Sequence, residues 1–126
     1  MRVAATGPAS RAAMWSAYAD PTRWSTWAPQ ITEVLAEGPL RPNLEGAVRG
    51  ILGVRAHFHV ISVDEPLGRW SWDVRSGPVR LRIDHEVEDR RTAVVIRGAA
   101  PLVLAYAPLA RAALGRLVRL GEDRAR

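Results

Sequence analysis

Apolar and polar residues alternate most regularly in two neighbouring segments in the middle of the chain. In residues 79–88 every second residue is apolar except His85, and all the residues between them are charged. Residues 69–75 repeat this pattern, with Trp70, Trp72 and Val74 alternating with polar residues. A period of two over this length predicts β-strands that bury one face and leave the other in water.

Further segments have strand character and are separated by short turn signals. Besides the two segments above, strands are expected at residues 2–6, 31–37, 45–52, 55–63 and 92–98. The turn signals between them are Gly53, Glu65-Pro66-Leu67-Gly68, Ser76-Gly77-Pro78 and Asp89-Arg90-Arg91. Because these connections are short, the strands from residue 31 onward are predicted to form an antiparallel meander.

Helical spacing appears before and after these strands. Residues 9–19 and 21–27 predict two short helices, with Asp20 as the cap of the second and Pro29 as its end. A longer helix is expected after Gly98, in which Pro108 produces a kink or marks the true beginning. Its predicted buried face consists of Leu102, Tyr106, Leu109, Ala113, Leu117 and Leu120.

This order of elements indicates an α+β protein and is the order found in the helix-grip fold. Several motifs also resemble those of the START-like (SRPBCC) superfamily, in particular its polyketide cyclase/dehydrase and lipid-transport branch. They are residues 9–20 followed by Trp24 and Trp27-Ala28-Pro29-Gln30-Ile31, then Gly46, Pro66-Leu67-Gly68-Arg69-Trp70, His85-Glu86-Val87 and Ala100-Pro101. The resemblance covers nearly the whole chain. It implies one START-like helix-grip domain over residues 1–126, with a curved antiparallel sheet of about six or seven strands around the long C-terminal helix.

In that family the sheet and the terminal helix enclose a cavity for apolar molecules. The resemblance therefore implies a protein that binds a hydrophobic small molecule, such as a lipid, a polyketide or an aromatic metabolite. Two alternatives stay open: an enzyme of the polyketide cyclase/dehydratase type, and a regulatory protein that binds a partner and no ligand. The family has no universal catalytic set, so the resemblance transfers no catalytic residue.

The expected ligand pocket is lined by aromatic and aliphatic residues from the predicted sheet and helices. These residues are Trp27, Phe58, Trp70, Trp72, Leu81, Ile83, His85, Leu102, Tyr106 and Leu109. Tryptophan offers a large stacking surface to a flat apolar ligand. The alternative interpretation is that the same side chains fill the core and leave no space, which is the usual role of apolar stripes.

His85 is the one histidine on an apolar strand face. Burial disfavours its charged form, so its pKa is expected to fall and its imidazole to be neutral near pH 7. It is a candidate for ligand contact, for proton transfer together with Tyr106, or for a structural role with Tyr106 as its hydrogen-bond partner.

The remaining ionisable residues predict a solvated surface. The net charge is +5 and all eighteen basic residues are arginine, but they are scattered and lack interleaved aromatic residues, so no nucleic-acid partner is expected. Asp84, Glu86 and Glu88 share a strand face with Arg80 and Arg82 and are expected to form surface ion pairs.

Metal, cofactor and membrane roles are not expected either. The chain has no cysteine, and His57, His59 and Asp73 would make only an incomplete metal site, so two solvated histidines are the favoured interpretation. No signal peptide pattern or membrane-spanning stretch appears, which makes the cytoplasm the expected location. The oligomeric state, monomer or homodimer, stays open.

Overall fold

The computed structural model describes residues 1–50 and 53–120. Seven antiparallel strands form one sheet in the order β1-β7-β6-β5-β4-β3-β2. The strands are β1 (Arg2–Thr6), β2 (Ile31–Leu35), β3 (Glu45–Gly50), β4 (Arg55–Asp64), β5 (Arg69–Ser76), β6 (Val79–Glu88) and β7 (Arg91–Gly98). The helices are α1 (Arg11–Ala19), the 3-10 turn η1 (Pro21–Arg23), α2 (Trp24–Trp27) and α3 (Ala100–Leu117).

The predicted elements are all present, and their ends shift by a few residues. Helix α1 begins at Arg11 because the Ser10 hydroxyl accepts a hydrogen bond from the Ala13 N–H at 3.1 Å. The second predicted helix consists of η1 and α2, and the Asp20 carboxylate caps it through the Thr22 N–H at 3.1 Å. Strand β2 stops at Leu35, two residues earlier than expected. The predicted end of the third strand, at residues 51–52, lies outside the described residues.

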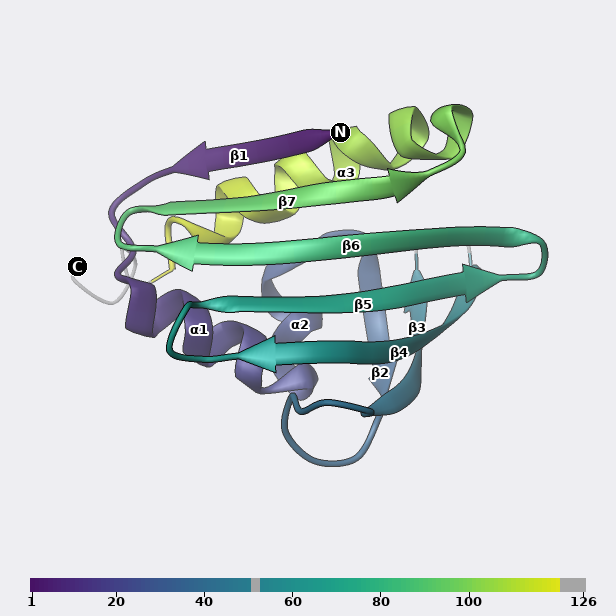
Figure 1. The fold of residues 1–126 in the computed structure, drawn as a ribbon, viewed down its shortest axis with the longest axis horizontal. Coiled ribbons are helices and arrows are strands. Elements are labelled where there is room, and N and C mark those ends of the chain that lie inside the picture. The colour runs from purple at the N-terminus through teal and green to yellow at the C-terminus, as the bar shows by residue number, and fades with distance from the viewer. Residues whose placement is uncertain (51–52, 121–126) are drawn as a thin grey trace.

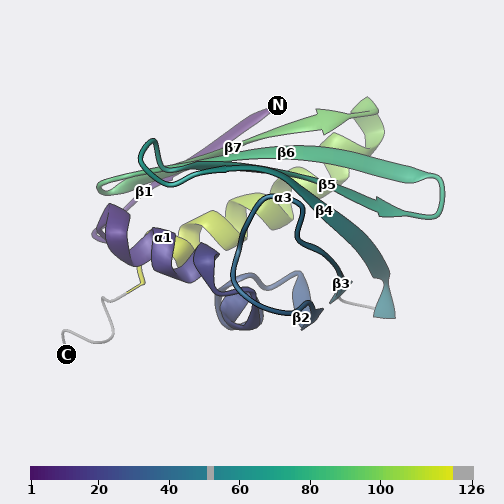
Figure 2. The same cartoon turned by 60° about the horizontal axis from the view of Figure 1, so that its bottom comes forward.

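All three α-helices cover the same side of the sheet, and the other side is open (Figures 1 and 2). Figure 2 shows the sheet bending over the helices at its β2–β3 end. The pairing is irregular at two places, between Ile31 and Glu33 in β2 and between Val60 and Ser62 in β4. Such bulges bend and twist a strand, so they account for part of the curvature that closes the sheet around α3.

The buried face of helix α3 matches the predicted one only in part: Ala113 and Leu117 are buried as expected, and Leu120 is partly buried beyond the end of the helix. Its buried residues are Val103, Ala107, Ala110, Ala113, Leu114 and Leu117. Leu102, Tyr106 and Leu109 lie at the edge of this face and are only partly buried. The helix begins at Ala100 and runs through Pro108, so of the two predicted roles of Pro108 the one as the beginning of the helix is wrong. Pro108 and Leu104 are both exposed, and the Leu104 carbonyl that lacks its helical N–H partner can therefore be hydrated.

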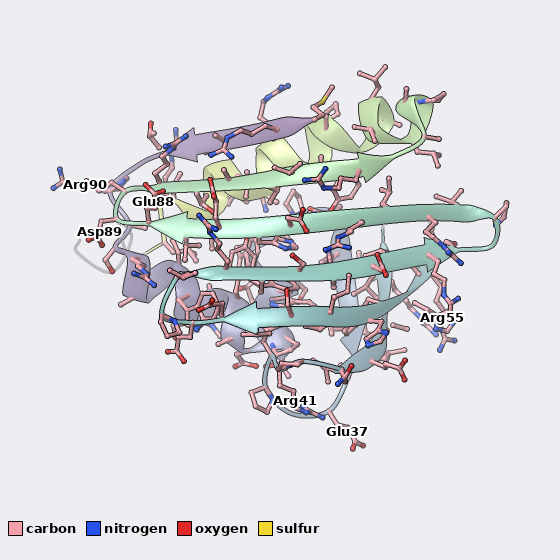
Figure 3. All side chains as sticks on the ribbon, in the orientation of Figure 1. Glu37, Arg41, Arg55, Glu88, Asp89 and Arg90 are labelled. Atoms are coloured by element: carbon pink, nitrogen blue, oxygen red, sulfur yellow. The ribbon has the colours of Figure 1, made fainter. Side chains whose placement is uncertain are left out.

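The outward face of the sheet carries charged side chains, whose nitrogen and oxygen tips appear in Figure 3. The Asp84 carboxylate lies 3.3 Å from Arg82 Nε and 3.0 Å from Arg97 Nε, and Glu86 pairs with Arg2. Surface ion pairs of this kind contribute under about 1 kcal/mol each. Among the described helices none is long and apolar enough to cross a membrane.

Replacement of Gly68 by alanine should destabilise the fold by at least about 2 kcal/mol. Gly68 ends the β4–β5 turn at φ +67°, and a Cβ there would lie 2.6 Å from the Val87 carbonyl oxygen. Gly77→Ala is the matched control, because Gly77 has φ +56° and a Cβ added there would meet nothing within 4 Å. It should show only the backbone cost of about 1 kcal/mol. Urea unfolding measures both, and equal losses would contradict the steric argument.

Candidate functional site

The interior of the helix grip is an aromatic cluster. Strand β5 directs Trp70 and Trp72 inward, because residues two apart share a strand face. The short helix α2 adds Trp24 and Trp27, and Tyr18 comes from α1. Trp24 is stacked on Trp70 with ring centroids 5.8 Å apart, and Trp72 meets both rings edge-on at 5.2 Å. Four of the five tryptophans thus meet under the sheet.

A small inner pocket of about 40 Å³ lies within this cluster. Trp27, Trp70 and His85 line it from one side, and Ala110 and Ala113 of α3 line it from the other. This volume holds one or two water molecules and no larger ligand. The aromatic side chains therefore fill most of the space, as the core-filling interpretation expected.

A larger outer pocket of about 270 Å³ continues toward Gly50 and Val54, the β5–β6 turn and the middle of α3. Its walls are mostly aliphatic: Ile31, Val48, Val54, Ala56, Val74, Val79, Leu81, Ile83 and Leu109. Val54 and Val79 at its rim remain 55% and 37% exposed. Arg75 also lies at this rim, and Figure 3 shows the neighbouring Arg55 at the same end of the sheet.

The two pockets share five wall residues, Gln30, Ile31, Trp72, Ile83 and Tyr106. Gln30 lies in the loop between α2 and β2, and its Nε2 donates to the Tyr106 hydroxyl at 3.2 Å. We call this shared wall the junction. The polar side chains in the wall of the outer pocket are those of the junction, Arg75 and Ser76, and the Ser76 hydroxyl donates to the Arg55 carbonyl oxygen at 2.7 Å.

His85 is held rigidly in the cluster. Its ring is stacked on Trp70 with centroids 3.8 Å apart and planes at 2°, and it lies opposite Trp70 in the β5–β6 register. Nδ1 lies 3.1 Å from the Trp70 carbonyl oxygen. Because a carbonyl only accepts, Nδ1 carries the proton and Nε2 has a free lone pair. Burial lowers the pKa of His85 to about 3, against the opposing effects of this hydrogen bond and of Asp84.

The predicted pairing of His85 with Tyr106 is not formed. His85 Nδ1 instead bonds to the Trp70 carbonyl oxygen on the facing strand β5, and the Tyr106 hydroxyl accepts a hydrogen bond from Gln30 Nε2. Burial raises the pKa of Tyr106, and the hydrogen bond with Gln30 opposes that effect, so the hydroxyl keeps its proton at neutral pH. Burial likewise raises the pKa of Tyr18. Chemically, the neutral His85 can accept a proton only at Nε2, and Tyr106 can donate one.

Four buried polar atoms have no hydrogen-bond partner among the described residues. They are the indole nitrogens of Trp27, Trp70 and Trp72 and the Oε1 of Gln30. Each such group costs about 1–3 kcal/mol when it is left unpaired. All four belong to residues that line the inner pocket, and two of these residues also line the outer pocket.

The structure brings most of the predicted ligand residues together. Trp27, Trp70 and His85 line the inner pocket, Leu81 and Leu109 line the outer one, and Trp72, Ile83 and Tyr106 line both. Phe58 and Leu102 lie outside both pockets: Phe58 packs on Trp24 and Trp72, and Leu102 packs against the core.

Sequence reasoning missed Gln30. The available signal was one amide in the otherwise apolar stretch Trp27-Ala28-Pro29-Gln30-Ile31.

The histidines of β4 do not gather metal ligands. His57 and His59 are exposed on the outward face, and His59 Nε2 lies 3.1 Å from Asn43 Oδ1. In residues 1–50 and 53–120 no group of three His, Cys, Asp or Glu side chains is placed to hold a metal ion.

Two solved structures have the same arrangement of strands and helices. DynU16, described as a putative protein in the dynemicin biosynthetic locus, matches with a TM-score of 0.70 and 18% identity over 98% of this chain. The match covers 47% of the DynU16 chain, so this chain spans about half of its length. Ara h 8.0201 matches with a TM-score of 0.67 and 14% identity, over 94% of this chain and 96% of that one. At these identities the likeness concerns the fold.

Fold and pocket together define a helix-grip protein, in which a curved sheet encloses a long C-terminal helix. The family model described as polyketide cyclase / dehydrase and lipid transport matches residues 1–125, and the chain belongs to that family. No curated protein gives a significant sequence match. The resemblance to this branch of the START-like superfamily is therefore confirmed.

Proposed function

We propose that the protein binds a small, flat, hydrophobic molecule in the outer pocket between the sheet and α3. The observation that carries this proposal is the apolar pocket of about 270 Å³ with two exposed valines at its rim. Binding would remove apolar surface from water at roughly 25 cal/mol per Å². The volume lies just below the roughly 300–1,000 Å³ of typical ligand pockets, so the ligand that fits is small.

Membership of the family supports the proposal, because the family's description includes lipid transport and polyketide cyclases, whose ligands are mainly apolar. The inner pocket is too small to add a second ring system. The outer pocket and the junction therefore decide which ligands fit.

An uncharged fluorescent probe, N-phenyl-1-naphthylamine, should bind with saturable enhancement of its emission. Ala56→Phe should weaken that binding at least tenfold, because Ala56 lines the outer pocket and a phenyl ring there occupies the ligand space. His57→Phe is the matched control: it adds the same ring on the opposite face of β4 and should leave the affinity unchanged. Failure of the probe to bind, or equal weakening by both variants, would refute the proposed pocket.

A further inference from the structure

In the described part of the chain, three pairs of arginines face one another across neighbouring strands on the outward face of the sheet. They are Arg82 and Arg97, Arg49 and Arg55, and Arg75 and Arg80. Like charges placed directly opposite each other destabilise a sheet, so an anion beside each pair is favourable. The chain supplies a carboxylate to the first pair through Asp84 and to the second through Glu33, which lies 3.6 Å from Arg49.

The pair of Arg82 and Arg97 shows how an anion fits between two such arginines. The Asp84 carboxylate lies 3.3 Å from Arg82 Nε and 3.0 Å from Arg97 Nε, and it accepts a hydrogen bond from the Ser71 hydroxyl at 2.7 Å. Burial by itself would raise the pKa of Asp84, but the hydrogen bonds from Ser71 and the two arginines hold it below its ordinary value. One carboxylate is thus held by two arginines that would otherwise repel each other.

The third pair, Arg75 and Arg80, has no such carboxylate. Both side chains are exposed, and within residues 1–50 and 53–120 neither forms an ion pair. Arg55, whose facing arginine is the one paired with Glu33, also forms no ion pair with a described residue. It lies next to the third pair, because its carbonyl oxygen accepts a hydrogen bond at 2.7 Å from Ser76, the residue after Arg75.

These three arginines line one groove of about 560 Å³ in the outward face of the sheet. Figure 3 shows Arg55 at this end of the sheet. The groove lies on the face opposite the inner pocket and is open to water, so an ion in solution reaches the guanidinium groups directly. Glu45 and Asp73 also line it, but neither forms an ion pair with these arginines.

We propose that Arg55, Arg75 and Arg80 form a binding site for the phosphate group of a small phosphate monoester, held between arginines as Asp84 is. A phosphate monoester carries close to two negative charges near neutral pH and three strong acceptor oxygens. It therefore matches three guanidinium groups, whose planar forks bind phosphate oxygens in pairs, better than a singly charged carboxylate does. The rest of the molecule lies along the groove.

The test compares phenyl phosphate with benzoate, which share a ring and differ in the charge of the anionic group. At constant ionic strength, phenyl phosphate should shift the side-chain Nε–H signals of Arg75 and Arg80 in ¹H–¹⁵N spectra until they saturate. It should bind at least about fivefold more tightly than benzoate, and Arg80→Gln should weaken it by about the same factor. Arg80 is the residue to change because, unlike Arg75, it does not line the outer pocket.

Arg69→Gln is the matched control, because Arg69 is exposed on the same face of β5 and lies outside the groove. It removes the same charge and should change the affinity less than about twofold, since distant surface charges are screened. Equal weakening by Arg69→Gln and Arg80→Gln would show that net charge alone attracts the anion, and would overturn the site. Benzoate that binds as tightly as phenyl phosphate would overturn the phosphate assignment.

Asp73→Asn checks whether the chain's own carboxylate takes the place of the ligand. Asp73 is two residues from Arg75 on the same strand face, as Asp84 is from Arg82. Asp73→Asn should strengthen the binding of phenyl phosphate, because a competing negative charge is removed. Binding that appears only in this variant would mean that Asp73 already neutralises the arginines, and would overturn the proposal.

A soluble metabolite and a lipid headgroup can both present a phosphate monoester. Sedimentation with vesicles of phosphatidic acid and phosphatidylcholine separates these sources: retention that Arg80→Gln abolishes assigns the phosphate to a lipid headgroup, and no retention assigns it to a soluble molecule. Saturating N-phenyl-1-naphthylamine should leave the affinity for phenyl phosphate unchanged, because the pocket for that probe lies under the sheet. If the naphthylamine probe does not bind, the proposed function fails while the phosphate site stands.

Discussion

The free energy of unfolding should fall by about 1.4 kcal/mol for each pH unit below 6.5 because of His85 alone. In the folded protein, burial keeps the pKa of His85 at about 3, against an ordinary value of 6.5. Between these two values the unfolded chain binds a proton that the folded chain does not bind. The stabilisation is therefore complete above pH 6.5 and is lost progressively as the pH falls toward 3.

Urea unfolding at a series of pH values measures this slope. His85→Gln removes the titrating group and keeps a side chain that can donate to the Trp70 carbonyl, so the slope in this window should largely disappear. His57→Gln is the control, because His57 is exposed on the outward face and this variant should keep the slope. A slope that persists unchanged in His85→Gln would show that His85 is protonated in the folded protein.

Trp24→Ala should cost about 3–5 kcal/mol of stability, which is the range for large aromatic residues in a core. Trp24 is 2% exposed, stacks on Trp70, and contacts Phe58 with ring centroids 5.7 Å apart. Alanine would leave a cavity among rigid rings on a sheet, and these rings cannot collapse into it. The loss would be a large part of the roughly 5–15 kcal/mol typical of a whole domain.

Guanidinium unfolding of the two Trp24 variants separates packing from hydrogen bonding. Trp24→Phe keeps most of the ring contact and loses the bond to the Tyr18 carbonyl, so its cost should stay near about 1–2 kcal/mol. A loss below about 1 kcal/mol in Trp24→Ala would mean that the aromatic cluster repacks. The cluster could then also rearrange to enlarge the inner pocket beyond its present volume of about 40 Å³.

The strands could be predicted from the sequence because their physics is local. Alternation in β5 and β6 requires only that one face be buried. The observed burial follows it at Trp70 and Trp72 and from Leu81 to Val87, His85 included, whereas Val74 is only partly buried and Val79 is exposed. The turns were equally clear: Gly68 and Gly77 both adopt the positive φ that favours glycine.

The face of α3 could not be predicted in the same way. Residues 102–110 are apolar almost all around the helix, so periodicity alone does not select a face. Packing decides it: the helix lies mainly against β1 and β7, and Ala110, Ala113 and Leu114 share the inner pocket with the tryptophans of β5. Tyr106 and Leu109 are consequently turned to the edges, where they line the pockets.

By itself, the sequence determined the order of the elements, the one-sided burial of the sheet, the aromatic character of the interior and the family. These properties depend on residues close together along the chain. The tertiary structure alone decided the partner of His85, the meeting of Gln30 with Tyr106, and how much space the tryptophans leave. The hydrogen bond between Gln30 and Tyr106 joins residues 76 positions apart in the sequence. The partner of His85 is a backbone carbonyl on the facing strand, which the pattern of side chains does not reveal. Whether four large rings fill a cavity or border one depends on their packing angles in three dimensions.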